Sequence, residues 1–268
     1  MIIITRPQVE NLLRGYQGIN LLRQALNKSS GQEIGEVVTQ YVLFNHLFGA
    51  GVANLASQLA VSNLFRDVSE PTLYNDRSME VASRVFAAAI DEFGDRDVVL
   101  RPTHRMLAQA VVKGVAQYYH WDKNKLDKLL QKFNASIDQK VCEGYGIRNS
   151  KTEQDLFKSL GFHVGSELLA DYEFKILDRT IHEIQPDLVN HLKQSDVSVS
   201  GVPVPAYTWI SLHTRVEIDH FEYALAGVNL ALKYYVGNQE KEKVEAQIIG
   251  GIHHFAAFQE QFMRTLNE

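Results

Sequence analysis

The spacing of apolar residues constrains the fold of this chain most strongly, because these residues recur at intervals of three and four along most of its 268 residues. That interval is the period of an amphipathic helix, whereas the two-residue alternation of a half-buried strand is almost absent. Gly, Pro and Asn residues separate the helical stretches. The predicted helices cover about residues 7–28, 33–64 with a break near Gly49 and Gly51, 77–93, 102–119, 124–138, 151–184, 186–194, 206–236 and 239–266.

One segment, residues 197–204, alternates as a strand would. Gly201, Pro203 and Pro205 lie in or beside it and favour an extended loop, because proline cannot donate a ladder hydrogen bond. No composition shift or internal repeat divides the chain. We therefore predict one all-α domain of roughly eight helices around a common core.

Composition and charge exclude several classes of function. The 27 Lys and Arg against 32 Asp and Glu give a net charge of −5 without a basic run, so a nucleic-acid partner is not expected. The single cysteine, Cys142, cannot form an internal disulfide, which favours the cytoplasm. The N-terminus lacks a signal-peptide pattern. Residues 37–65 carry no charge, but interspersed Asn, Gln, Ser and His side chains indicate a buried helix rather than a membrane span.

The pattern that indicates chemistry is a triplet of two histidines and one glutamate. The sequence contains no phosphate-binding glycine loop and no nucleophile elbow, and Cys142 is read as a packed residue rather than a nucleophile. His213, Glu217 and His220 stand at i, i+4 and i+7, so at 100° per residue they share a 60° sector with apolar neighbours. Burying them is costly unless a partner satisfies them. A metal does so; hydrogen bonds to backbone or carboxylate remain the alternative.

Charged and imidazole side chains also fall on the apolar stripes of other predicted helices. Glu92 continues the stripe of helix 77–93, and His104 begins that of helix 102–119. In helix 151–184, Glu173 faces the expected core. Glu167 falls with Asp171 on a face that the pattern predicts to be solvated, so Glu173 is preferred as a ligand.

Together these residues predict a two-metal centre. Three carboxylates and three imidazoles without a thiolate suit iron or manganese better than structural zinc. Helix bundles are a usual scaffold for such pairs. The predicted ligands are Glu92, His104, Glu173, His213, Glu217 and His220.

This order of residues resembles the haem-oxygenase-like diiron oxidases and oxygenases, including the CADD-type proteins. The segment YEFKILDRTIHEI resembles the family's helix in which a Tyr-Glu pair supplies the third ligand, and DEFGDRDVVLRPTH resembles its acidic turn. The resemblance implies a single all-α haem-oxygenase-like domain over residues 1–268. It also implies two Fe(II) per chain, with manganese or partial occupancy left open. With O2 as co-substrate, a peroxo-diiron(III) species would oxidise a small amino-acid-like or fatty-acid-like substrate.

Side chains near the metals would select the substrate, in a pocket that is mainly apolar. Each candidate also fits a plain core position, and His46 could instead serve as an accessory ligand. The candidate substrate-binding residues are Tyr41, Phe44, Asn45, His46, Tyr172 and Trp209.

Other functions and partners stay open. A homodimer and a redox partner or chemical reductant are compatible with the sequence. A TenA-like hydrolase without metal would use Cys142 or a buried carboxylate. A non-catalytic helical interaction protein would carry a vestigial metal site.

Overall fold

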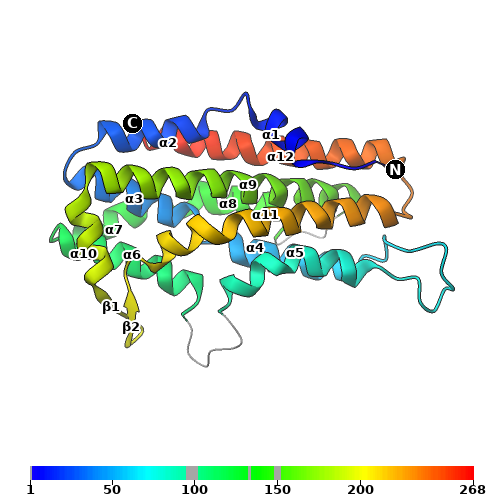
Figure 1. The fold of residues 1–268 in the computed structure, drawn as a ribbon, viewed down its shortest axis with the longest axis horizontal. Coiled ribbons are helices and arrows are strands. Elements are labelled where there is room, and N and C mark those ends of the chain that lie inside the picture. The colour runs from blue at the N-terminus through cyan, green and yellow to red at the C-terminus, as the bar shows by residue number, and fades with distance from the viewer. Residues whose placement is uncertain (1, 95–101, 132–133, 148–151) are drawn as a thin grey trace.

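The architecture is an elongated bundle of helices with a two-stranded sheet near one end (Figure 1). The computed structural model describes residues 2–94, 102–131, 134–147 and 152–268. The predicted all-α class is confirmed. In chain order the elements are α1 (Arg6–Leu13), α2 (Gly18–Lys28), α3 (Gln32–Phe44), α4 (Phe48–Ala60), α5 (Ser78–Glu92), α6 (His104–Tyr118), α7 (Lys123–Gln131), α8 (Asn134–Tyr145), α9 (Glu153–Ile184), α10 (Pro186–Gln194), β1 (Asp196–Val199), β2 (Val202–Pro205), α11 (Thr208–Tyr234) and α12 (Lys241–Thr265).

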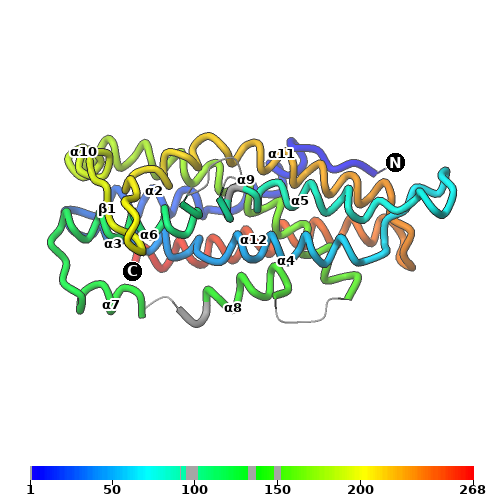
Figure 2. The backbone as a smooth tube through the Cα atoms, turned by 90° about the horizontal axis from the view of Figure 1, so that it is seen from below, coloured from blue at the N-terminus to red at the C-terminus, as the bar shows by residue number. Residues whose placement is uncertain are grey.

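The long helix α9 lies at the centre of the bundle and is buried along most of its length (Figures 1 and 2). It packs against α11 and α12, with α2 also against it, while α5 packs against α4 and α11. Helices α9 and α12 approach closely at two glycines. A Cβ on Gly161 would lie 1.8 Å from the carbonyl oxygen of Ile248, and one on Gly251 would lie 1.9 Å from that of Lys158. Only glycine therefore fits where the two backbones meet.

Two of the predicted helices are each divided in two. Stretch 33–64 breaks between Phe44 and Phe48, so the predicted break near Gly49 and Gly51 is wrong in position. Both glycines instead lie inside α4, where a Cβ would come within 2.7 Å of Glu92 and 2.3 Å of Tyr145. They make room for neighbouring side chains. Stretch 7–28 divides in the same way, into α1 and α2, whereas stretch 124–138 overlaps α7 and α8, between which residues 132–133 lie outside the described part of the chain.

The expected loop at residues 197–204 is a β-hairpin. β1 and β2 pair antiparallel, with Val199 opposite Val202. The turn residues Ser200 and Gly201 have φ of 52° and 81°, as a two-residue hairpin turn requires. The prolines of β2 are tolerated because each strand has one neighbour in this sheet. The hairpin packs against α6.

Among the described residues, every helix is either too short or too polar to traverse a bilayer. Most of the uncharged segment 37–65 is divided between α3 and α4, and most of its apolar residues lie in the core of the bundle, with Val61 exposed. This agrees with the interpretation of that segment as buried helix.

Candidate metal centre

Four helices bring six ligand-type side chains together in the interior of the bundle. Glu92 is the last residue of α5, and His104 is the first of α6, where the Thr103 side chain caps the helix by accepting from the Met106 amide. Helix α9 contributes Glu167, and α11 contributes the remaining three. The six residues form two groups, Glu92 with His104 and His213, and Glu167 with Glu217 and His220; within each group the ligand atoms lie within 4.8 Å of one another.

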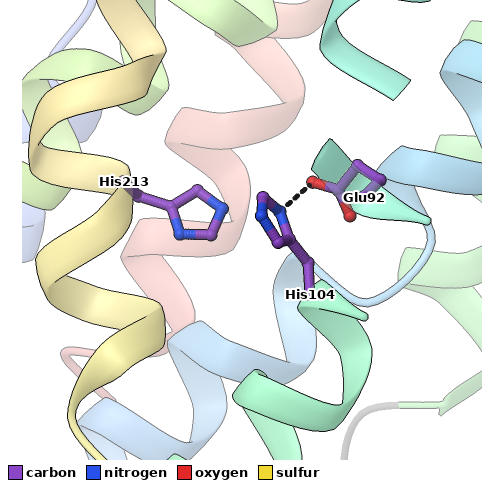
Figure 3. A group of neighbouring side chains, drawn as sticks. All are labelled: Glu92, His104 and His213. Carbon is purple, nitrogen blue, oxygen red and sulfur yellow. Dashed lines mark hydrogen bonds and ion pairs between the residues drawn. The ribbon is translucent and has the colours of Figure 1, made fainter. Parts of the chain in front are cut away.

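The first group is held by contacts that orient its imidazoles (Figure 3). Nδ1 of His104 lies 2.9 Å from Oε1 of Glu92, and the His104 and His213 rings lie 4.7 Å apart. Nδ1 of His213 donates to the carbonyl oxygen of Trp209 at 2.6 Å. Because a carbonyl can only accept, Nδ1 of His213 carries the proton and Nε2 is the nitrogen that would bind a metal, as in metal-binding histidines whose other ring nitrogen donates to a carbonyl.

Glu217 connects the two groups. Its Oε1 lies 3.6 Å from Nε2 of His213, and its Oε2 lies 3.5 Å from Nδ1 of His220. On the other side of His220, Nδ1 lies 3.7 Å from Oε2 of Glu167. For metal–ligand distances of about 2.1 Å, ligands at angles of about 90° to 110° lie about 3.0 to 3.4 Å apart, so small side-chain shifts would accommodate ions here.

The electrostatics of the second group reflect two buried carboxylates side by side. Burial raises the pKa of Glu217, and the neighbouring Glu167 carboxylate raises it further. Burial alone would also raise the pKa of Glu167, but contacts with His163 and His220 outweigh it and hold that pKa below its ordinary value. Buried acids of this kind need a proton or a cation.

The structure places Glu167, rather than Glu173, with the other ligand-type residues. The predicted solvated face of α9 is wrong, because Glu167 and Asp171 are only 7% and 2% exposed. Neighbouring helices enclose α9 at the level of Glu167 and Asp171, so these two side chains do not reach solvent. Glu167 and Glu173 differ by six residues and point to different sides of the helix.

Glu173 takes part in a separate buried network. It is 1% exposed, and it accepts hydrogen bonds from Tyr41 Oη at 2.8 Å and Gln259 Nε2 at 2.6 Å. Burial raises the pKa of Glu173 to about 7, against the opposing effect of these two donors. Near neutral pH both the protonated and the ionised form of Glu173 are therefore populated beside the cavity described next.

A cavity of about 520 Å³ opens onto both groups. Phe44, Asn45, His46 and Trp209 line it as expected, whereas Tyr41 and Tyr172 do not. Tyr41 is directed to Glu173, and Tyr172 lies elsewhere on α9, where its hydroxyl donates to Glu10 at 3.2 Å.

The role of His46 as an accessory ligand is disfavoured by its contacts. Nδ1 of His46 donates to the carbonyl oxygen of Leu43 at 2.6 Å, and Nε2 lies 3.1 Å from Oδ1 of Asp138. Both ring nitrogens therefore have protein partners. Cys142 is buried at 7% exposure and is not among the residues that line the cavity.

Sequence reasoning missed the contribution of α6 beyond His104. Arg105, Gln109 and Lys113 also line the cavity, and so does Val112. Their spacing could have indicated this, because Arg105, Gln109 and Lys113 are four residues apart and therefore lie along one side of the helix, next to the side that carries His104. What the sequence did not show is that α7 and the β-hairpin enclose this face, through Leu126, Leu130, Val199 and Ser200.

Comparison with known proteins supports the fold. No family model and no curated protein matches the sequence. Among solved structures, a CADD-like protein of unknown function from Nostoc punctiforme PCC 73102 matches with a TM-score of 0.60 and 13% identity, over 97% of this chain and 94% of that chain. The chain has a CADD-like fold. The resemblance expected from the sequence is confirmed at the level of the fold, and the neighbour's description assigns no activity.

Proposed function

We propose that this protein is a non-haem diiron oxidoreductase that uses O2 to oxidise a small organic substrate. The observation that carries the proposal is the pair of His and carboxylate groups joined by Glu217 beside an internal cavity. The CADD-like fold supports it.

The residues present fit two divalent ions. The donor set contains only nitrogen and oxygen, which suits iron or manganese. The neighbouring carboxylates Glu167 and Glu217 are buried with one imidazole close to both, an arrangement that a cation stabilises. Glu92, His104 and His213 would hold one ion, while Glu167 and His220 would hold the other. Glu217 would be shared, since its two oxygens face the two groups.

When bound, two Fe(II) ions would supply the electrons for O2 activation, and a redox partner or chemical reductant would restore them. The chain's own contribution is orientation and exclusion of water. The Trp209 carbonyl fixes the tautomer of His213, and Phe174 stacks on the His213 ring at 4.4 Å. Apolar side chains form most of the cavity wall. Glu173, whose pKa burial raises to about 7, can take up or release a proton next to this space.

The cavity favours a substrate with an apolar body and one anionic group. Its cationic lining residues include Arg105 and Lys113 of α6, both with exposed side chains. Apart from the two metal-type groups, its acidic lining in the described part of the chain is Glu173, whose oxygens already accept from Tyr41 and Gln259. A substrate ammonium would therefore lack a carboxylate partner. We favour the fatty-acid-like over the amino-acid-like alternative.

Anaerobic titration of the metal-free protein with Fe(II) tests the metal centre. We expect two equivalents for the wild type and fewer for His213→Ala. His182→Ala is the matched control, because His182 is half-buried on α9 and belongs to neither group. Absence of Fe(II) binding by the wild type, with no difference in metal content for His213→Ala, would refute the proposal. Fe(II)-loaded protein should then consume O2 faster when its substrate is present.

Calorimetry with the metal-free protein tests the substrate class separately. Decanoate should bind more tightly than decanol or norleucine. The double substitution Arg105→Gln/Lys113→Gln should weaken the binding of decanoate about three- to tenfold, as expected for exposed ion pairs. Lys158→Gln, an exposed change on α9, is the control. Equal binding of decanoate and decanol, or no effect of the double substitution, would refute the charge argument.

A further inference from the structure

His163 lies one helical turn before Glu167 on α9 and belongs to neither metal-type group. It is fully buried, at 0% exposure, and its Nδ1 lies 3.1 Å from Oε1 of Glu167. Its Nε2 is buried with no hydrogen-bond partner among the described residues. An imidazole in this position has no part in the function proposed above, although its burial is costly.

The surrounding hydrogen bonds fix the direction of the His163 contact. Ser166 Oγ donates its one proton to the carbonyl oxygen of His163 at 2.7 Å. The Tyr145 hydroxyl, 3.0 Å from Ser166 Oγ, must then be the donor in that pair. The Tyr145 proton is thus not directed at His163 Nδ1, from which its oxygen lies 3.4 Å away. Nδ1 of His163 therefore carries a proton and donates it to Glu167.

The other ring nitrogen supports the same tautomer. A buried N–H without an acceptor costs the full desolvation of the donor, whereas an unused lone pair on a neutral ring costs less. Nε2 of His163 is therefore the nitrogen with the lone pair. The His163 imidazole thus donates from Nδ1 to Oε1 of Glu167.

Because of this hydrogen bond, the two oxygens of Glu167 have different partners. Oε1 is held by His163, and Oε2 is directed to Nδ1 of His220 at 3.7 Å. Without the first contact, Oε1 of Glu167 would lose its hydrogen-bond donor, and the carboxylate would be free to rotate. We propose that His163 is a positioning residue that holds Glu167 so that Oε2 is presented to the ion bound by Glu217 and His220. This inference rests on the proposed function.

Substitutions that move or remove the donor provide the test. In His163→Asn the amide nitrogen occupies roughly the place of Nδ1, whereas in His163→Gln it occupies roughly that of Nε2, and His163→Leu has no donor. Co(II), which does not react readily with O2 in such sites, reports ligation through its visible absorption. We expect His163→Leu and His163→Gln to weaken one of two Co(II) equivalents about 10- to 100-fold, as loss of an outer-shell partner typically does, and His163→Asn to restore most of that affinity.

The controls separate this inference from the proposed function. His182→Leu, on the same helix, should bind both equivalents as the wild type does. If the wild type binds no Co(II), the proposed function and the inference fail together. If the wild type binds two equivalents and His163→Leu does too with equal affinity, the inference alone is overturned. Equal weakening of Co(II) binding in His163→Asn and His163→Gln would overturn the inference as well.

Two further measurements cover a poorly folded variant and the metal-free state. If His163→Leu lowers the melting temperature sharply, the comparison of Asn with Gln carries the test, because both are amides. In the metal-free protein, long-range ¹H–¹⁵N spectra should show a proton on Nδ1 of His163. Observation of the Nε2–H tautomer would contradict the hydrogen-bond assignment.

Discussion

The buried carboxyl group of Glu173 should make the stability of this protein depend on pH in a predictable direction. Burial raises the pKa of Glu173 from 4.5 to about 7. The protonated form is thus favoured in the folded state, and the resulting stability is complete below the unfolded pKa and is lost as pH rises through about 7. This difference between the folded and the unfolded pKa corresponds to about 3 kcal/mol of unfolding free energy. About 2 to 3 kcal/mol of it should be lost between pH 5 and pH 8.

The substitution Glu173→Gln removes the titrating group and keeps the shape. The new amide can donate to Gln259, whose Oε1 is buried without a hydrogen-bond partner in the described part of the chain, and can accept from Tyr41. Urea unfolding of the metal-free proteins at pH values from about 5 to 8 measures the effect as a difference between wild type and variant. Between pH 5 and pH 8, the free energy of unfolding of the variant should rise by about 2 to 3 kcal/mol relative to that of the wild type. Parallel stability profiles for the two proteins would refute the reasoning.

The same variant decides which acid of α9 binds metal. Glu173→Gln should retain two equivalents of Fe(II), because Glu173 belongs to neither group. Glu167→Gln should lose affinity for one equivalent. The opposite result, with loss only in Glu173→Gln, would restore the ligand assignment made from the sequence.

Three further substitutions test the centre, the packing and the alternative chemistry. Glu217→Gln should raise the melting temperature of the metal-free protein, because burial disfavours the Glu217 carboxylate, while weakening both Fe(II) equivalents; wild-type affinity for both would argue against a shared ligand. Gly51→Ala should destabilise the fold by about 1 to 3 kcal/mol in urea unfolding, because the added Cβ meets the Tyr145 ring at 2.3 Å. Gly250→Ala, where nothing lies within 4 Å, is its control and should be neutral or stabilising, and equal effects of the two would contradict the packing argument. Cys142→Ala should leave O2-dependent turnover unchanged, whereas a hydrolytic activity that needs no metal and is lost in Cys142→Ala would favour a TenA-like hydrolase.

Periodicity predicted the helical class because amphipathic helices impose their spacing on the sequence wherever one side is buried. It did not predict the breaks at residues 45–47 or the use of Gly49 and Gly51, since a glycine that ends a helix and one that admits a neighbouring side chain look alike in sequence. The hairpin was missed for a similar reason. Its prolines are compatible with a strand only when the other edge is unpaired, and pairing is a property of the assembled fold.

For the candidate site too, some residues follow from local periodicity and others only from tertiary packing. His213, Glu217 and His220 lie within one helix, so their common direction follows from helical geometry alone, and the sequence also singled out Glu92 and His104 as misplaced polar groups on apolar stripes. The choice between Glu167 and Glu173 depended on which neighbours surround α9. That helix has no solvated side at this level, so the assumption that a polar stripe marks the surface fails. Local periodicity fixes the face of a residue on its helix, and only tertiary packing decides what lies opposite that face.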